Sequence, residues 1–173
     1  YDSPGDHLED EVRLTNYYSF SKYCSELAVA RVGGTILRTN FFGKSHVAGR
    51  KSLSDWVIES LQAKREINLF EDIFFSPLSI STLSRMIGRV VQQPKAGVFN
   101  LGSHGGLNKC EFALQIAQVF DLQTATTKKT QSAFKVYRPK DMRMNSSRFE
   151  KAFEVQLPAL SQEIKDLRRE YDV

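Results

Sequence analysis

The sequence predicts an α/β fold, because segments with apolar residues at helical spacing alternate with short runs rich in β-branched and aromatic residues. The chain has 173 residues, of which 41% are hydrophobic and 25% are charged. It is therefore long and apolar enough to bury a core, and it is not expected to be disordered. The predicted strands are too few for a complete doubly wound parallel sheet.

The first regular element is a helix that starts near Thr15. An apolar stripe that includes Phe20, Cys24 and Leu27 recurs at helical spacing, and the pair Gly33-Gly34 ends the pattern. A β-rich segment, TILRTNFFG at 35–43, follows and runs into a loop.

Helices and strands continue to alternate after this segment. In the helix predicted at 81–92, the apolar spacing directs Leu83, Ile87, Val90 and Val91 toward the core. The predicted elements are, in order, an amphipathic helix at 52–64, a strand at 67–70, the helix at 81–92, a strand at 97–103, a helix at 108–120, an extended lead with a short helix at 138–153, and a last helix from Pro158 to near Tyr171.

Charge and cysteine usage exclude several classes of function. The net charge is +4, and the basic residues are scattered apart from short clusters at 128–129 and 168–169, which suits a nucleotide at least as well as a nucleic acid. No apolar run is long enough for a membrane span, and no signal peptide opens the chain. We therefore expect a cytoplasmic protein without a membrane or nucleic-acid partner. Cys24 and Cys110 lack CxxC spacing and are predicted to be reduced core thiols, with no metal site.

A glycine-rich loop between a strand and a helix is one candidate for a cofactor site. In VFNLGSHGGLNKCEFALQI, residues 98–116, Gly102 and Gly105 take the first two positions of a GxxGxxG variant, and Asp121 lies near the place of an acidic ribose ligand. The third position is Asn108, which forms a capping-box pattern with Glu111 and does a different job from a glycine. The alternative is a tight turn followed by a capped helix.

A tyrosine and a lysine four residues apart form the other candidate site. On a helix Tyr18 and Lys22 lie on the same face. A free tyrosine has a pKa of about 10, and an adjacent ammonium favours the phenolate, so such a pair can exchange a proton near neutral pH. The alternative is an ordinary surface ion-pair stripe, because Glu26 lies four residues beyond Lys22.

The segment around this pair resembles the P-x-N-x-Y-G-x-S-K motif of extended short-chain dehydrogenases/reductases. Leu14 replaces the usual proline and Ser19 replaces the usual glycine, and neither position carries the chemistry. The matching residues in LTNYYSFSKYCSE are Asn16, Tyr18, Ser21, Lys22 and Glu26.

Further segments are similar to dTDP-4-dehydrorhamnose reductases within that group, in the same order along the chain. They are ILRTNFFG at 36–43, FFSPLSISTLSRMI at 74–87, GVFNLGSHGGLNKCEFALQIA at 97–117 and RPKDMRMNSSRFEKAFEVQLP at 138–158. The resemblance thus covers nearly the whole chain, from Tyr1 to about Tyr171.

The resemblance implies the C-terminal part of a Rossmann-type NAD(P)-binding fold plus a smaller α/β substrate-binding domain. Residues 1–43 would end the Rossmann domain. Residues 44–173 would be mostly the sugar-nucleotide binding region, with some segments returning to the Rossmann sheet. The third member of the catalytic triad and the phosphate-binding loop would lie before Tyr1. We therefore expect this chain to be inactive without an N-terminal Rossmann half.

The resemblance implies NADP or NAD as the cofactor, and hydride transfer from its reduced form, NADPH or NADH, to a 4-keto nucleotide sugar such as dTDP-4-dehydrorhamnose. Tyr18 would donate a proton to the carbonyl oxygen. Lys22 would favour the phenolate of Tyr18 and hydrogen-bond the nicotinamide ribose. Both residues would thus serve catalysis and cofactor binding.

Four further residues receive binding roles from the same resemblance. Thr39 and Asn40 would lie beside the nicotinamide, and Phe41 would line the sugar pocket. Arg138 would grip the substrate diphosphate, since a guanidinium binds phosphate oxygens in a bidentate manner. The alternatives are strand packing for Phe41 and a plain surface arginine for Arg138.

Two other functions stay open on the same fold. Some relatives of these reductases are non-catalytic regulatory or binding subunits, which the intact Tyr18 and Lys22 argue against. Sugar-nucleotide epimerases or dehydratases use the same scaffold with additional acid and base groups. The resemblance is also compatible with a homodimer.

Overall fold

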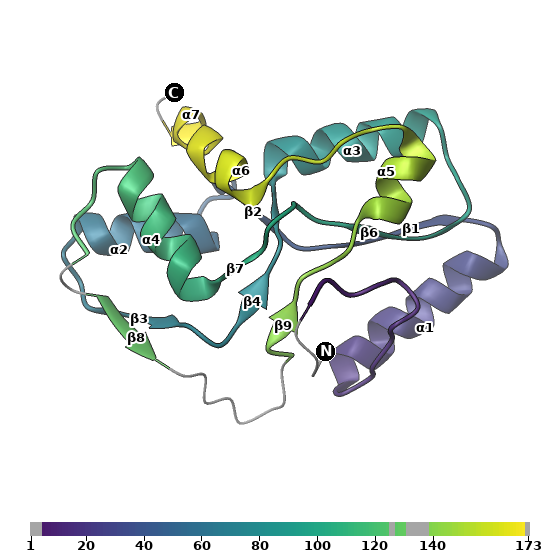
Figure 1. The fold of residues 1–173 in the computed structure, drawn as a ribbon, viewed down its shortest axis with the longest axis horizontal. Helices are drawn as coiled ribbons and strands as arrows, with labels where there is room; N and C mark the ends of the chain where they lie inside the picture. The colour runs from purple at the N-terminus through teal and green to yellow at the C-terminus, as the bar shows by residue number, and fades with distance from the viewer. Residues whose placement is uncertain (1–4, 125–126, 131–138, 172–173) are drawn as a thin grey trace.

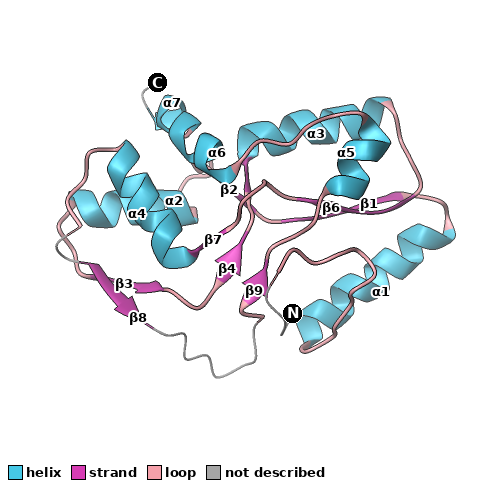
Figure 2. Cartoon of the chain, viewed as in Figure 1, coloured by secondary structure: helices cyan, strands magenta, loops and turns pink. Residues whose placement is uncertain are grey.

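Helices and short strands alternate along the computed structural model, which describes residues 5–124, 127–130 and 139–171 (Figures 1 and 2). The helices are α1 (Tyr17–Arg31), α2 (Leu53–Gln62), α3 (Ile80–Gln92), α4 (Lys109–Val119), α5 (Ser147–Phe153), α6 (Leu160–Asp166) and α7 (Arg168–Tyr171). The strands are β1 (Thr35–Thr39), β2 (Phe41–Phe42), β3 (Ile67–Phe70), β4 (Phe74–Phe75), β5 (Leu78–Ser79), β6 (Gly97–Leu101), β7 (Leu107–Asn108), β8 (Thr127–Thr130) and β9 (Asp141–Met142). The predicted α/β class is confirmed.

The longest strand pair joins segments that are far apart in the sequence. β1 and β6 pair in parallel, with Thr35 opposite Gly97 and Thr39 opposite Leu101. A parallel pair needs a long crossover, and the crossover here contains α2 and α3. The carboxyl ends of β1 and β6 therefore lie side by side, which is the edge where open α/β sheets bind ligands.

The remaining strands form three small sheets. β4 lies between the antiparallel β7 and the parallel β9. β2 pairs in parallel with β5, and β3 pairs in parallel with β8. Figure 1 shows β3 and β8 below α2 and α4 at one end of the molecule, while α1, β1 and β6 lie at the other end.

Two hydrophobic clusters hold these elements together. In the first, α2, α4 and α6 bury their apolar faces, and the Phe112 ring meets Phe42 and Phe75 edge-on, with both centroid distances 5.0 Å. In the second, β6 contributes Phe99, which contacts Phe149 and Phe153 of α5 edge-on. Edge-to-face packing adds to the free energy gained by burying these rings.

Two expectations about burial are wrong. Ile87 and Val91 of α3 are exposed, because the buried face of this helix runs through Leu83, Met86 and Val90. Residues 87 and 91 lie on the flank of that face, one helical position away.

Cys24 is also exposed rather than a core thiol. None of the α1 residues is buried, so the apolar stripe of this helix faces away from the described residues. Cys110 is buried as expected, and burial raises the pKa of its thiol.

Candidate active site

The α1 helix that carries Tyr18 and Lys22 has well-defined ends. Asn16 accepts a hydrogen bond from the Ser19 backbone N–H, and the Ser19 hydroxyl accepts one from the Asn16 N–H. This capping box satisfies donors that have no partner within the helix. The helix stops before Gly33, whose φ of +69° lies in the left-handed region.

Tyr18 and Lys22 contact each other as the spacing predicts. The Lys22 ammonium nitrogen lies 5.6 Å from the centroid of the Tyr18 ring, within the range of a cation–π interaction. Tyr18 is 72% exposed, so the described residues leave most of its side chain uncovered.

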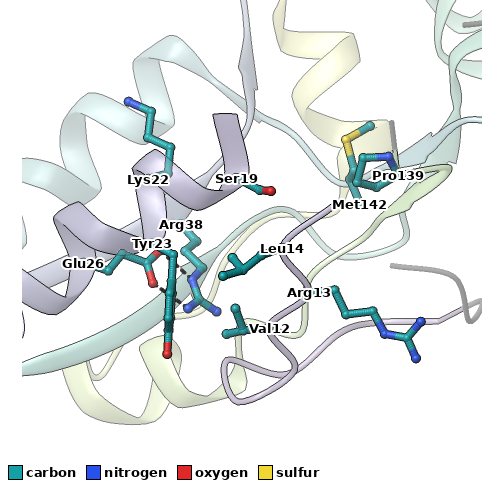
Figure 3. A pocket seen from close by; sticks show the side chains of 10 residues that line it. All are labelled: Val12, Arg13, Leu14, Ser19, Lys22, Tyr23, Glu26, Arg38, Pro139 and Met142. Atoms are coloured by element: carbon teal, nitrogen blue, oxygen red, sulfur yellow. Dashed lines mark hydrogen bonds and ion pairs between the residues drawn. The ribbon is translucent and has the colours of Figure 1, made fainter. Parts of the chain in front are cut away.

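The alternative pairing of Lys22 with Glu26 does not form. Glu26 instead accepts two hydrogen bonds from the Arg38 guanidinium, at 2.8 Å from Nε and 2.6 Å from Nη2. Figure 3 shows the Lys22 side chain directed away from this ion pair. The surface-stripe interpretation of Lys22 is therefore not what the structure shows.

A small pocket lies next to this helix. Its volume is about 190 Å³. The segment 12–14 and the turn into β9 form one side of it, and α1 with Arg38 forms the other (Figure 3). It is lined by Val12, Arg13, Leu14, Ser19, Lys22, Tyr23, Glu26, Arg38, Pro139 and Met142. Lys22 thus belongs both to the lining of the pocket and to the contact with the Tyr18 ring.

The segment before α1 is held in place by a buried carboxylate. Glu9 is 3% exposed, and its Oε1 accepts the backbone N–H of Asn100 at 2.9 Å. The Glu9 carbonyl accepts a hydrogen bond from Arg38 Nη1 at 2.7 Å. One wall of the pocket is thereby tied to both β1 and β6.

The carboxyl end of β1 is Thr39, and Asn40 and Phe41 follow it. Asn40 Oδ1 is buried and has no hydrogen-bond partner among the described residues. Phe41 is 58% exposed although it belongs to β2. Thr39 donates only a long hydrogen bond of 3.3 Å to the Asn40 carbonyl. Arg138 lies outside the described residues.

The glycine-rich loop after β6 packs against protein at Gly102 and Gly106, whereas a Cβ at Gly105 would meet no atom within 4 Å. A Cβ at Gly102 would lie 2.6 Å from the Ser76 carbonyl oxygen, and one at Gly106 would lie 2.7 Å from the Phe75 carbonyl oxygen. At the start of α4, Asn108 and Glu111 complete the expected capping box, and the Glu111 carboxylate disfavours an anion there. This geometry agrees with the capped turn rather than with a phosphate cradle.

Asp121, the candidate ribose ligand beside this loop, is engaged elsewhere. Its carboxylate accepts a hydrogen bond from Arg168 at 3.0 Å, and its φ of +55° places it in the left-handed region after α4. It is a turn residue that ties α4 to α7.

Two features of the site region were missed in the sequence. The Arg38–Glu26 pair joins residues of a strand and a helix, and no local pattern marks it. Lys109, the first residue of α4, lies with its ammonium nitrogen 3.3 Å from the Phe75 ring centroid, and burial lowers its pKa to about 8. A lysine at a helix start gives no sequence signal for such burial.

Among the described residues, no cluster of His, Cys, Asp and Glu is arranged to hold a metal ion. The described helices also include none that combines the length and apolar character of a membrane span.

The family of this chain is shown by a comparison with models of known protein families. The family model described as the RmlD substrate binding domain matches residues 6–173. The chain belongs to this family. The comparison with curated proteins gave no match.

Solved structures of related enzymes share the fold. A dTDP-4-dehydrorhamnose reductase from Bacillus anthracis in complex with NADP matches with a TM-score of 0.86 and 21% identity, over 98% of this chain and 60% of that chain. The ortholog from Clostridium acetobutylicum matches with a TM-score of 0.86 and 17% identity, over 99% of this chain and 61% of that one. A dTDP-glucose 4,6-dehydratase from Bacillus anthracis in complex with NAD matches with a TM-score of 0.80 and 14% identity, over 99% of this chain and 57% of that chain. The chain therefore spans about three fifths of the length of these relatives.

Proposed function

We propose that this chain is the C-terminal part of an NAD(P)-dependent reductase that transfers hydride to a 4-keto nucleotide sugar such as dTDP-4-dehydrorhamnose. The observation that supports the proposal most is the Tyr18–Lys22 contact on α1, in a chain of the RmlD substrate-binding family. The family alone indicates a sugar-nucleotide ligand, and the pair adds a group that can give a proton.

The side chains near α1 suit the nicotinamide end of a dinucleotide. The Lys22 ammonium can donate to ribose hydroxyls, and Asn40 Oδ1 is a buried acceptor with no partner among the described residues. Thr39 adds a hydroxyl beside Asn40. When bound, NADPH or NADH supplies the hydride. Gly102 packs closely against Ser76, and in this proposal the phosphates are bound by the dinucleotide-binding half.

Tyr18 acts as the general acid in this proposal. Its phenol gives a proton to the carbonyl oxygen of the sugar while the carbonyl carbon gains hydride, so a ketone becomes a secondary alcohol. The phenolate that forms lies beside the Lys22 ammonium, which stabilises the negative charge. The positive charge is available because Glu26 is bound to Arg38.

Phe41 and Arg138 have binding roles in this proposal. The exposed Phe41 ring, at the start of β2, offers an apolar face for a sugar ring. Arg138 contributes a guanidinium for the diphosphate, which matches the bidentate geometry of phosphate oxygens.

Residues 1–43 complete the Rossmann part in this proposal, and 44–173 form most of the substrate-binding region. β6 lies within the second range and pairs with β1 of the first, so β6 would return to the Rossmann sheet. The exposed Phe20 and Leu27 of α1 offer an apolar surface to the dinucleotide-binding half of the enzyme or to a second copy of it.

A turnover assay tests this function. The chain joined to its dinucleotide-binding half is mixed with NADPH or NADH and dTDP-4-dehydrorhamnose, and loss of the reduced cofactor is followed by its absorbance. We expect cofactor oxidation that depends on the sugar. Binding of the nucleotide sugar without any oxidation would favour a regulatory subunit instead.

A further inference from the structure

We propose that Arg38 is a positioning residue, which holds the Glu26 carboxylate and so leaves the Lys22 ammonium beside Tyr18. The inference rests on the proposed function only for its consequence in catalysis. The geometric claim stands on the contacts among Arg38, Glu26 and Lys22.

Arg38 holds Glu26 with a bidentate ion pair. Nε donates to Oε1 at 2.8 Å and Nη2 donates to Oε2 at 2.6 Å, so both carboxylate oxygens face the planar guanidinium. The side chains of Arg38 and Glu26 are 19% and 17% exposed. Such a half-buried pair is less screened by solvent than a surface pair.

A third hydrogen bond fixes the guanidinium itself. Arg38 Nη1 donates to the Glu9 carbonyl at 2.7 Å, and the Glu9 carboxylate in turn accepts the Asn100 backbone N–H. The Arg38 fork is thus oriented by β1, by the segment before α1 and by β6. It cannot follow Glu26 if that side chain turns toward solvent.

Lys22 and Arg38 are competitors for the same carboxylate. Lys22 and Glu26 are four residues apart on α1, the spacing at which oppositely charged side chains pair on a helix. The structure instead places the Lys22 nitrogen over the Tyr18 ring. Removing the guanidinium would leave Glu26 without this partner, and the Lys22 ammonium is the cation that its helix brings within reach.

An alternative is that Arg38 only fastens α1 to β1. The two roles make different predictions for the contact between Tyr18 and Lys22. Both residues belong to α1, so their contact does not depend on how the helix docks. The Tyr18–Lys22 contact changes only if another group binds the Lys22 ammonium.

The test compares Arg38→Met with the double variant Arg38→Met/Glu26→Gln by NMR spectroscopy of this chain. In the unchanged protein we expect the Lys22 ε-methylene protons to show an upfield ring-current shift and cross-peaks to the Tyr18 ring, because the Lys22 nitrogen lies over that ring. We expect Arg38→Met to reduce both signals at least twofold and the double variant to restore them. Arg38→Lys, which keeps a cation next to Glu26, should preserve them.

An unchanged Lys22–Tyr18 contact in Arg38→Met would overturn the proposal, and so would failure of Glu26→Gln to restore it. If Arg38→Met does not fold, Arg38→Gln takes its place in the comparison with the double variant. Glutamine fills similar space and keeps one amide donor. In the active reductase, Arg38→Met should lower kcat with little change in the KM for the nucleotide sugar, and adding Glu26→Gln should recover kcat. The NMR experiment does not measure turnover. It therefore tests the role of Arg38 even if the proposed reductase function is wrong.

Discussion

Lys22 holds its ammonium nitrogen 5.6 Å from the centroid of the Tyr18 ring, while the neighbouring carboxylate of Glu26 is bound by Arg38. An isolated YxxxK spacing does not distinguish a catalytic pair from a charged surface stripe. The bidentate Arg38–Glu26 contact argues against the charged stripe, because it occupies the acid that would otherwise pair with the lysine. The catalytic role of the pair is the proposal that this arrangement supports.

The contact between α7 and α2 should make stability depend on pH. Tyr171 donates to Asp55 Oδ1 at 2.5 Å, and Asp55 Oδ2 accepts the backbone N–H groups of Ser45 and Ser52. Burial acts to raise the pKa of Asp55, but the hydrogen bonds outweigh it and the pKa is lowered. A lowered carboxyl pKa stabilises the fold above the unfolded-state value and loses this effect as the pH falls through the folded-state value.

We therefore expect Tyr171→Phe to lose about 1.5 to 3 kcal/mol of unfolding free energy at neutral pH. The loss should shrink as the pH falls below the ordinary carboxyl pKa of 3.8. Urea unfolding at a series of pH values measures this, with the 94% exposed Tyr17, changed to Phe, as the matched control. A loss that is the same at every pH would contradict the account.

Lys109 should cost stability while it is charged. Burial lowers its pKa from 10.5 to about 8, so at neutral pH the folded protein holds an unfavourable buried ammonium. The unfolded chain binds more protons between these two pKa values, and stability therefore rises as the pH increases through this range. The cation–π contact with Phe75 offsets part of the cost.

Lys109→Met keeps an apolar side chain over Phe75 and removes the charge. We expect it to raise the unfolding free energy by about 1 to 3 kcal/mol at pH 7, with the advantage declining between pH 8 and pH 10.5. Exposed Lys151, changed to Met, is the control. Lower stability of Lys109→Met at pH 7 would show that the ammonium contributes favourably.

Gly102, in the loop after β6, should respond to substitution differently from a glycine whose added Cβ would meet no other atom. A Cβ at Gly102 would lie 2.6 Å from the Ser76 carbonyl oxygen, whereas a Cβ at Gly88 in α3 meets no atom within 4 Å. Gly102→Ala should therefore destabilise the protein by about 1 to 3 kcal/mol, and Gly88→Ala should stabilise it by about 0.5 to 1 kcal/mol. Thermal unfolding of the two variants measures these changes in stability. Equal effects would mean that the loop can move away from Ser76.

This chain alone should bind dinucleotides very weakly. Gly102 and Gly106 of its glycine-rich loop pack closely against protein, and the start of α4 is capped by Asn108 and Glu111. Calorimetry with NADPH should detect no binding at micromolar concentrations of protein and ligand. Micromolar affinity would mean that the described residues include a phosphate site that the geometry does not reveal.

Much of the secondary structure could be read from the sequence because its signals are local. The capping pattern of Asn108 and Glu111 predicted the start of α4, and Gly33-Gly34 predicted the end of α1. Tyr18 and Lys22 could be paired in the same way, since their contact lies within one helix.

Features that depend on long-range packing could not be predicted. The Arg38–Glu26 pair requires the position of β1 against α1, which no spacing in the sequence gives. Cys24 was misplaced for the same reason, because an apolar stripe shows which face of a helix is apolar and not which residues cover it. The exposure of Ile87 and Val91 reflects the rotation of α3 on its neighbours.

The central claim is that Tyr18 is the proton donor of a nucleotide-sugar reductase. It is tested most directly by kcat for NAD(P)H-dependent reduction of dTDP-4-dehydrorhamnose, measured in the chain joined to its dinucleotide-binding half. We compare the unchanged enzyme with Tyr18→Phe and with Tyr17→Phe, which alters the adjacent exposed phenol. We expect Tyr18→Phe to lower kcat by about 10²- to 10⁴-fold and Tyr17→Phe to leave it unchanged. Near-normal turnover by Tyr18→Phe would contradict the assignment.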